Sequence, residues 1–164
     1  MIVRPERDGD TLAIRHVLIA AFGRTAEADL VERLRRDGDL ILSLVADDGD
    51  VRSYAGFPRL SVEDASGAHP ATGLALVAVV PDLQRRGIGS ALIRAGHRML
   101  ADKGVSLAFV LGNPTYYTRF GYSVSAADPF ASAYSGPHFM AVRLNTDAPQ
   151  GGIVHYPAAF AALA

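Results

Sequence analysis

Residues 74–92 have the sequence LALVAVVPDLQRRGIGSAL, and this stretch decides the fold. Its first part, Leu74 to Val80, is an aliphatic run that is too short for a helix and rich in β-branched residues, which predicts a buried strand. Pro81 has no N–H group to donate, so strand pairing ends there. Apolar residues at helical spacing follow from Leu92 onward. The predicted order is therefore strand, glycine loop, helix.

The loop between this strand and this helix has the chemistry of a phosphate-binding turn. Gly87 and Gly89 have no Cβ atom, so a ligand can approach the backbone N–H groups closely. The first N–H groups of a helix have no partner within the helix, and the helix dipole places positive potential there. Arg85 and Arg86 come directly before the glycines. We therefore expect a phosphate or a pyrophosphate on this turn.

Two common phosphate-binding motifs do not fit this loop. The Walker motif needs a lysine followed by serine or threonine after its last glycine, but Ser90 and Ala91 follow Gly89. The dinucleotide fingerprint needs a third glycine where Leu92 stands and an acidic residue about 20 residues further on. The next predicted strand, which ends at residue 111, lacks that acidic residue. A tight glycine turn without a ligand is the other interpretation of this spacing.

The composition narrows the possible classes of function. A chain of 164 residues is long enough to bury a substantial core, and we expect one domain over residues 1–164. The formal net charge of −1 gives no basic excess for nucleic acid. The absence of cysteine excludes disulfides, thiolate-bound zinc and a cysteine acyl-enzyme. The five histidines lack the spacing of metal ligands, so no metal site is expected.

The hydropathy pattern gives an expectation about location. The longest aliphatic runs are far too short to span a bilayer. The N-terminal residues also lack the apolar core of a signal peptide. We therefore expect a cytoplasmic protein without membrane contact. Its oligomeric state is expected to be a monomer or a homodimer.

Two other stretches carry predictions about the sheet and its neighbours. Residues 51–62 have strand composition, but Gly56 and Pro58 within them favour a bend or an exposed edge over continuous central pairing. Residues 63–72, which contain another glycine and another proline, are predicted to be a loop.

A further helix is predicted to begin after a strand over 105–111. Asn113 and Pro114 have the residue types of a helix cap and a first helical position.

The glycine loop also resembles a known family signature. The run Gln84-x-x-Gly87-x-Gly89, preceded by Val-Pro, resembles the acyl-CoA signature (Gln/Arg-x-x-Gly-x-Gly/Ala) of the GNAT superfamily of N-acetyltransferases. The predicted order of strands and helices matches the GNAT fold over essentially the whole chain. The resemblance implies an α/β (α+β) fold, in which a mixed and mostly antiparallel central sheet is flanked by helices.

A second marker of the resemblance lies further along the chain. Residues 116–122, YYTRFGY, resemble the Tyr-x-x-x-Gly-Phe segment of the superfamily, with Tyr117 in the place of the general acid and Tyr122 replacing the phenylalanine. The run FVLGNPxYYxRFG and the ending YPxxF look like one bacterial subgroup of acetyltransferases with mostly unassigned acceptors. Tyr116 points about 100° away from Tyr117 around a helix, so we expect it to have no part in the chemistry.

The resemblance implies acetyl-CoA as cofactor and an amine as acceptor. It implies direct attack by a primary amine of a small molecule or peptide, in a ternary complex, with Tyr117 donating a proton to the departing sulfur. Two central strands would splay apart, and backbone amides near Val79 would hold the thioester carbonyl. The implied cofactor-binding residues are Ala78, Val79, Gln84, Arg85, Arg86, Gly87, Ile88, Gly89 and Ser90, together with Asn113, which is either a helix cap or a pantetheine contact.

The acceptor is the part of the resemblance that the residues support least. The strand over 51–62 borders the acceptor cleft in the superfamily, but it departs from the family pattern here. We assign its residues Tyr54, Phe57 and Arg59 to the acceptor. Glu27, Glu63, Asp82 and water all stay open as the base for the amine. The other classes of function are a non-catalytic acyl-CoA-binding or regulatory module and thioester hydrolysis, with Tyr117 then a core tyrosine.

Overall fold

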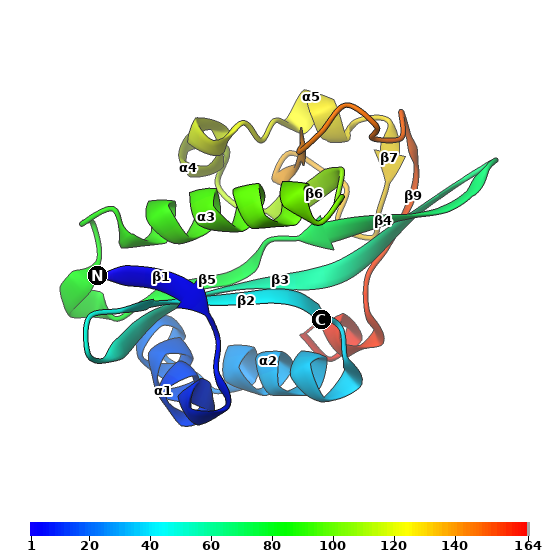
Figure 1. Cartoon of the computed structure of the whole chain (residues 1–164). Coiled ribbons are helices and arrows are strands. Elements are labelled where there is room, and N and C mark those ends of the chain that lie inside the picture. The colour runs from blue at the N-terminus through cyan, green and yellow to red at the C-terminus, as the bar shows by residue number, and fades with distance from the viewer. Residues whose placement is uncertain (164) are drawn as a thin grey trace.

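A mostly antiparallel sheet forms the centre of the structure (Figure 1). The computed structural model describes the backbone of residues 1–163 and the side chains of residues 1–161. Within this range nine strands join in one sheet along the path β1-β2-β3-β4-β6-β8, with β5 and β9 also paired to β3. The strands are β1 Ile2–Pro5, β2 Leu40–Asp47, β3 Val51–Asp64, β4 Gly67–Gly73, β5 Ala75–Val79, β6 Leu107–Leu111, β7 Phe130–Ala131, β8 Phe139–Arg143 and β9 Gly152–His155. The β4–β6 and β7–β9 pairs are parallel, and the other pairs are antiparallel.

Three long helices cover the two faces of the sheet (Figure 1). α1 (Thr11–Phe22) and α2 (Ala26–Asp37) lie on one face, and α3 (Ile88–Asp102) lies on the other. Two short helices, α4 (Pro114–Tyr117) and α5 (Val124–Ala127), follow β6. The predicted mixed, mostly antiparallel sheet flanked by helices is therefore confirmed.

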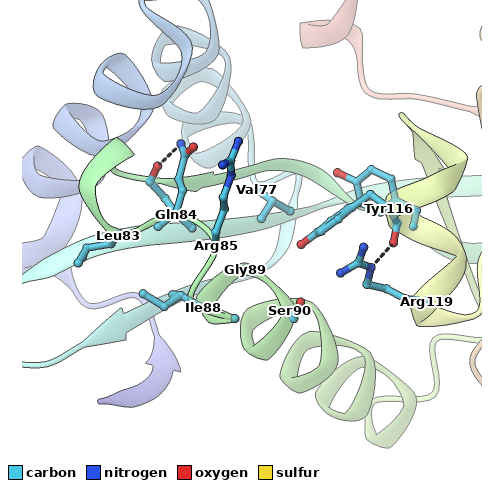
Figure 2. A pocket seen from close by; sticks show the side chains of 12 residues that line it. Val77, Leu83, Gln84, Arg85, Ile88, Gly89, Ser90, Tyr116 and Arg119 are labelled. Carbon is cyan, nitrogen blue, oxygen red and sulfur yellow. Dashed lines mark hydrogen bonds between the residues drawn. The ribbon is translucent and has the colours of Figure 1, made fainter.

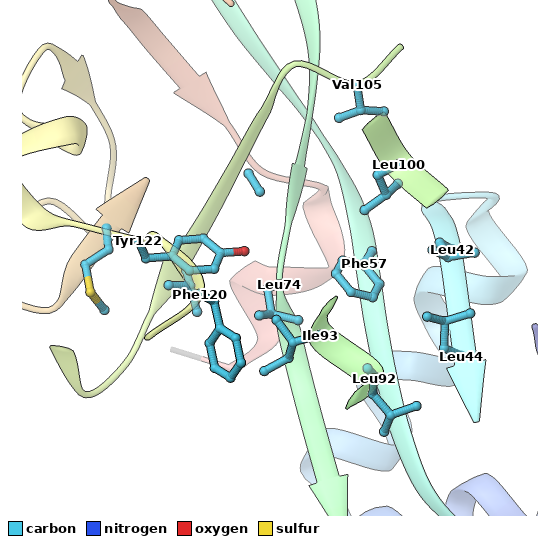
Figure 3. Close-up of a cluster of buried hydrophobic side chains, with 14 of the residues drawn as sticks. Leu42, Leu44, Phe57, Leu74, Leu92, Ile93, Leu100, Val105, Phe120 and Tyr122 are labelled. Atoms are coloured by element: carbon cyan, nitrogen blue, oxygen red, sulfur yellow. The ribbon is translucent and has the colours of Figure 1, made fainter. Parts of the chain in front are cut away.

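Each long helix buries an apolar stripe against the sheet. α1 packs Ile14, Val17 and Leu18 in one buried cluster with residues of β2, β3 and β5. α3 packs against the opposite face, where its leucines meet Phe57 (Figure 3). Gly96 permits this approach, because a β-carbon there would be 2.2 Å from Cζ of Phe57.

The strand β3 is the centre of the sheet, so the exposed edge, one of the two predicted alternatives, is wrong. It pairs with β2 and β5 over its first half and with β4 and β9 over its second. Pro58 is the last residue paired with β2, and Arg59 is the first paired with β4. The missing N–H of proline therefore falls where the strand changes neighbours.

The predicted loop over residues 63–72 is also wrong. Glu63 and Asp64 continue β3, and β4 begins at Gly67. Gly67 has φ of +124°, which allows a tight reversal there. Pro70 pairs opposite Ser61 within the resulting hairpin.

Candidate active site

Two central strands diverge in the middle of the sheet. β4 pairs with β6 at Thr72 and Gly73, and the N–H of Leu74 donates to the carbonyl of Phe109 at 2.8 Å. Beyond this point β5 pairs with β3 and has no partner on its other edge within residues 1–163. Leu76 has φ of 66°, a left-handed conformation that is uncommon outside glycine. The splay implied by the family resemblance is thus present, and backbone strain lies beside it.

A cleft with a volume of about 630 Å³ lies at the divergent end of β5 (Figure 2). Two stretches that are distant in sequence form it: residues 77–90, from the end of β5 through the loop into α3, and α4 with the turn after it. The lining residues are Val77, Val79, Leu83, Gln84, Arg85, Gly87, Ile88, Gly89, Ser90, Tyr116, Tyr117 and Arg119.

The start of α3 presents unpaired N–H groups beside the cleft. Gly87 is the N-cap residue, and its φ of 81° is a conformation that glycine adopts without strain. The first intrahelical bond runs from the N–H of Ala91 to the carbonyl of Gly87 at 3.0 Å. The N–H groups of residues 88–90 therefore have no acceptor within the helix and lie at the positive end of its dipole. This end of the cleft can bind an anion.

Arginines and a glutamine complete this end of the site. Arg85 lines the cleft, whereas the neighbouring Arg86 is exposed and does not line it. The side-chain amide of Gln84 donates through Nε2 to the carbonyl of Val79 at 2.9 Å (Figure 2). Gln84 therefore ties the loop to the end of β5.

The backbone of Val79 is directed toward the open edge of β5. The N–H of Val80 donates to the carbonyl of Arg52, on the β3 side, at 3.1 Å. Because N–H groups alternate in direction along an antiparallel strand, the N–H of Val79 points the other way, toward the edge that β6 has left. Ala78 is not brought to the cleft, since its side chain is buried with α1 and its N–H points toward β3.

The short helix α4 brings two adjacent tyrosines to the cleft. Asn113 is its N-cap: the side-chain oxygen accepts a hydrogen bond from the N–H of Thr115 at 2.9 Å, and the residue does not line the cleft. Burial raises the pKa of Tyr117, which keeps the phenol protonated at neutral pH. Among the described residues no side chain or backbone group forms a hydrogen bond with the Tyr117 hydroxyl. This hydroxyl can therefore donate to a ligand.

Tyr116 lines the cleft as well, although its side chain was expected to point away from that of Tyr117, and whether it takes part in the chemistry stays a prediction. Its hydroxyl would be 3.3 Å from a β-carbon on Gly89, across the cleft from α4. The guanidinium of Arg119 lies 4.6 Å from the centre of the Tyr116 ring, and its Nε donates to the Tyr116 carbonyl at 2.9 Å (Figure 2). Two residues 100° apart can both face a cleft that curves around a short helix. Neither Tyr116 nor Arg119 was singled out from the sequence as a cleft residue.

A second pocket, with a volume of about 460 Å³, adjoins the cleft. Val77 and Tyr117 line both cavities, so these two residues stand where the cavities meet. Of the bases left open by the sequence, Glu27 lines this pocket, whereas Glu63 and Asp82 line neither cavity. The lining residues are Phe22, Glu27, Leu30, Gly73, Leu74, Ala75, Leu76, Val77, Phe109, Leu111, Tyr117, Tyr134, Tyr156 and Phe160.

The residues expected to contact the acceptor are not part of either cavity. Tyr54 and Phe57 have no exposed surface, so their assignment to the acceptor is corrected. The Tyr54 hydroxyl lies 2.7 Å from Oγ of Ser43, and Phe57 packs on α3. The cause is the central place of β3, which is covered on both faces. Arg59 is exposed but lines neither cavity.

The described part of the chain offers neither a metal centre nor a membrane span. No group of three or more histidine, aspartate or glutamate side chains among residues 1–161 is placed to hold a metal ion. No helix in that range is both long enough and apolar enough to cross a bilayer.

Comparison with known proteins gives consistent relatives over the whole chain. Residues 3–125 match the family model described as Acetyltransferase (GNAT) domain. The chain is 34% identical to the uncharacterized N-acetyltransferase YhbS of Escherichia coli K12, over 95% of this chain and 96% of that protein. The crystal structure of E. coli YhbS in complex with CoA has a TM-score of 0.89 and 31% identity, covering 98% of this chain and 91% of that one.

A second crystal structure has a similar fold and a related ligand. It is a GNAT family acetyltransferase from Brucella melitensis in complex with acetyl-CoA, with a TM-score of 0.81 and 34% identity over 97% of each chain. Both relatives exceed 30% identity at nearly full coverage, and the family model spans most of the chain. The chain therefore belongs to the GNAT family of acetyltransferases.

Proposed function

We propose that this protein transfers the acetyl group of acetyl-CoA to the primary amine of a small molecule or peptide, by direct attack in a ternary complex. The observation that carries the proposal is that Val77 and Tyr117 line two adjoining cavities. One cavity has the anion-binding start of α3, and the other has space for a second substrate. The relatives crystallised with CoA and acetyl-CoA support the assignment of the first cavity to this cofactor.

The residues of the α3 loop fit the pyrophosphate of the cofactor. The free N–H groups of Ile88, Gly89 and Ser90 donate to its oxygens, and the charges of Arg85 and Arg86 favour its binding. Gln84 acts as a positioning residue, because its bond to the Val79 carbonyl fixes the end of β5 relative to the loop.

The chemistry requires charge stabilisation at one atom and proton donation at another. Bound acetyl-CoA supplies the acetyl group as a thioester, which an unprotonated amine attacks with loss of the sulfur as a thiolate. The N–H of Val79 donates a hydrogen bond to the carbonyl oxygen as negative charge develops there. The Tyr117 hydroxyl donates its proton to the departing sulfur. The nitrogen loses one proton as the amide forms, to Glu27 or to water, and the phenolate of Tyr117 takes a proton back from water.

The proton donation by Tyr117 depends on where the sulfur lies. A phenol has an ordinary pKa of about 10 and a thiol one of about 8.5, so this transfer is uphill in water. Burial raises the pKa of Tyr117 further. The hydroxyl is therefore an effective acid only if the thiolate forms within hydrogen-bond distance of it. The thiol that results can then donate a hydrogen bond back to the phenolate.

Acetyl-CoA turnover with and without a panel of primary amines tests the proposal. CoA should be released only when an amine is present, and an acetylated amine should appear in equal amount. Equal release without amine would identify a thioester hydrolase instead. Tight binding of acetyl-CoA without release in the presence of any amine would identify a binding or regulatory module.

A further inference from the structure

The second pocket has a strongly apolar and aromatic lining. Among its described lining residues, only Glu27 carries a side chain that is charged at neutral pH. Aromatic rings form much of the rest: Phe22, Phe109, Tyr117, Tyr134, Tyr156 and Phe160. Such a lining favours an apolar ligand, because a charged group moved there from water loses its hydration.

Three of these rings form a continuous wall. The rings of Tyr134 and Tyr156 meet edge to face with centroids 4.7 Å apart, and Tyr156 and Phe160 do so at 5.2 Å. Burial raises the pKa of Tyr156, so its hydroxyl stays neutral. The edge-to-face contacts hold the rings in fixed orientations, which suits recognition of an apolar surface.

The apolar lining continues to the molecular surface. Phe22 is 41% exposed and Leu111 is 51% exposed, although both are large apolar residues that line this pocket. They belong to different elements, the end of α1 and the end of β6. An apolar ligand that enters the pocket would cover both side chains.

The single carboxylate of the pocket already has a cation beside it. Glu27 is 4% exposed, and Nε of Arg24 donates to its two oxygens at 3.0 and 3.1 Å. If the acceptor carried an ammonium group in addition to its reacting amine, that ammonium would have to compete with the Arg24 guanidinium for the Glu27 carboxylate. A carboxylate on the ligand would meet the negative charge of Glu27 without a free cation lining the pocket in residues 1–161.

From these contacts we infer that the acceptor is a primary monoamine whose body is uncharged and apolar, held against the wall of Tyr134, Tyr156 and Phe160 with its nitrogen toward Tyr117. This inference rests on the proposed acetyl transfer, and it narrows the acceptor from any small-molecule or peptide amine to this class. Polyamines, amino acids and basic peptides are correspondingly poor acceptors.

Three amines with the same carbon chain test this inference directly. Hexylamine, hexamethylenediamine and aminocaproate differ at the far end, which carries a methyl group, an ammonium or a carboxylate. We expect kcat/KM for hexylamine to exceed that of each of the other two by more than about tenfold, because the far-end charge is desolvated in the pocket. Phenethylamine should rank with hexylamine.

Variants locate the preference in the pocket. Tyr156→Ala and Tyr134→Ala should each lower kcat/KM for hexylamine by about tenfold and reduce its advantage over the diamine. The affinity for acetyl-CoA should be unchanged in both variants, which shows that they are folded. Ile153→Ala is the matched control, since this apolar side chain is 49% exposed and lines neither cavity.

The outcomes separate this inference from the proposed function. Acetylation of the diamine or of aminocaproate as efficiently as hexylamine would overturn the inference while leaving acetyl transfer intact. An advantage for hexylamine that persists in both tyrosine variants would place the selecting surface elsewhere. Acetyl-CoA binding without acetylation of any of these amines would overturn this inference, whereas the proposed function would be overturned only if no amine of the wider panel were acetylated either.

Discussion

The ring of Tyr117 lies directly against the backbone of Gly112, so that a β-carbon on residue 112 would be 2.5 Å from Cε2 of the tyrosine. Gly112 follows the last residue of β6, and its N–H donates to the carbonyl of His138 at 3.0 Å. The backbone of residue 112 is therefore held in place, and the absence of a side chain there sets where the phenol of Tyr117 can lie.

The first prediction concerns Gly112→Ala. Gly112 is not among the residues with positive φ, so alanine fits the backbone and its cost is the collision with Tyr117. The ring must move, and we expect kcat to fall by about 10²-fold, the effect of a misplacement of about 1 Å. Steady-state kinetics on the purified variant measures this.

Gly9→Ala is the matched control for this substitution. Gly9 also lacks a positive φ, and a β-carbon there would meet nothing within 4 Å. This control should retain the wild-type kcat. If Gly112→Ala is as active as Gly9→Ala, then the position of the Tyr117 ring has no bearing on turnover.

The second prediction concerns the hydroxyl of Tyr117 itself. Tyr117→Phe keeps the ring that packs on Gly112 and removes the proposed proton donor. General acids contribute about 10²- to 10⁴-fold, so kcat should fall by this factor. The Kd for acetyl-CoA, measured by calorimetric titration, should hardly change, because the hydroxyl acts when the carbon–sulfur bond breaks.

Tyr54→Phe serves as the control for the loss of a tyrosine hydroxyl. It removes a buried hydrogen bond to Ser43 and should cost about 1 kcal/mol of stability with kcat intact. The same pattern in Tyr117→Phe would make Tyr117 a core tyrosine. If Tyr116→Phe is inactive and Tyr117→Phe is active, then Tyr116 is the general acid. The cleft geometry allows this, since both rings line the cleft.

The cleft at the start of α3 could be predicted from the sequence much better than the second pocket. The residues 81–90 are contiguous, and their structure follows from local rules: a proline that ends a strand, a glycine at a left-handed N-cap and the free N–H groups of a helix start. Seven of the cleft residues lie in or beside this loop. Helical periodicity alone could not place Tyr116, because it gives an angle around an axis and not the shape of the cavity.

The second pocket is assembled from segments that no spacing connects. Glu27 comes from α2, Leu76 from β5, Tyr134 from the segment before β8, and Tyr156 from the segment after β9. The acceptor assignment to Tyr54 failed for a related reason: an isolated strand pattern does not show how many neighbours the strand has. The ending YPxxF contains both Tyr156 and Phe160, but only the fold shows that they face the pocket.

The third prediction concerns Gly89→Val in the first turn of α3. A β-carbon at this position would lie 3.3 Å from the Tyr116 hydroxyl and 3.6 Å from Cγ1 of Val77, so the branched side chain would fill the cleft between them. We expect the affinity for acetyl-CoA to fall by more than about tenfold, since the pyrophosphate loses close access to the free N–H groups. Calorimetric titration of the folded variant gives this affinity.

Ala91→Val is the control for Gly89→Val, because it adds valine to the same helix turn at an exposed position outside the cleft. Its affinity for acetyl-CoA should equal that of the wild type. If Gly89→Val binds acetyl-CoA with unchanged affinity, then the cofactor does not bind at the loop of residues 84–90 that leads into α3.

The last prediction concerns stability in acid and depends on His97. Its Nε2 lies 2.8 Å from the hydroxyl of the buried Tyr122, and burial, helped by the charge of Arg94, lowers the pKa of His97 to about 4. An unfolded histidine has a pKa of about 6.5. Above about pH 6.5 both states are neutral, and below about pH 4 both bind the proton. Between these values only the unfolded state binds it, so His97 makes the protein less stable as the pH falls through this window.

The free energy of unfolding should therefore decrease by up to about 3 kcal/mol between about pH 6.5 and pH 4 because of this group. His97→Gln keeps a hydrogen-bonding group near Tyr122 but cannot titrate, so its stability should change less over this window. His16→Gln, at an exposed position, should follow the wild type. Carboxylates with lowered pKa, such as Asp64 at about 2, release their stabilisation at lower pH, which keeps the two effects apart. Parallel urea-unfolding curves for His97→Gln and the wild type across the window would show that another group controls the acid sensitivity.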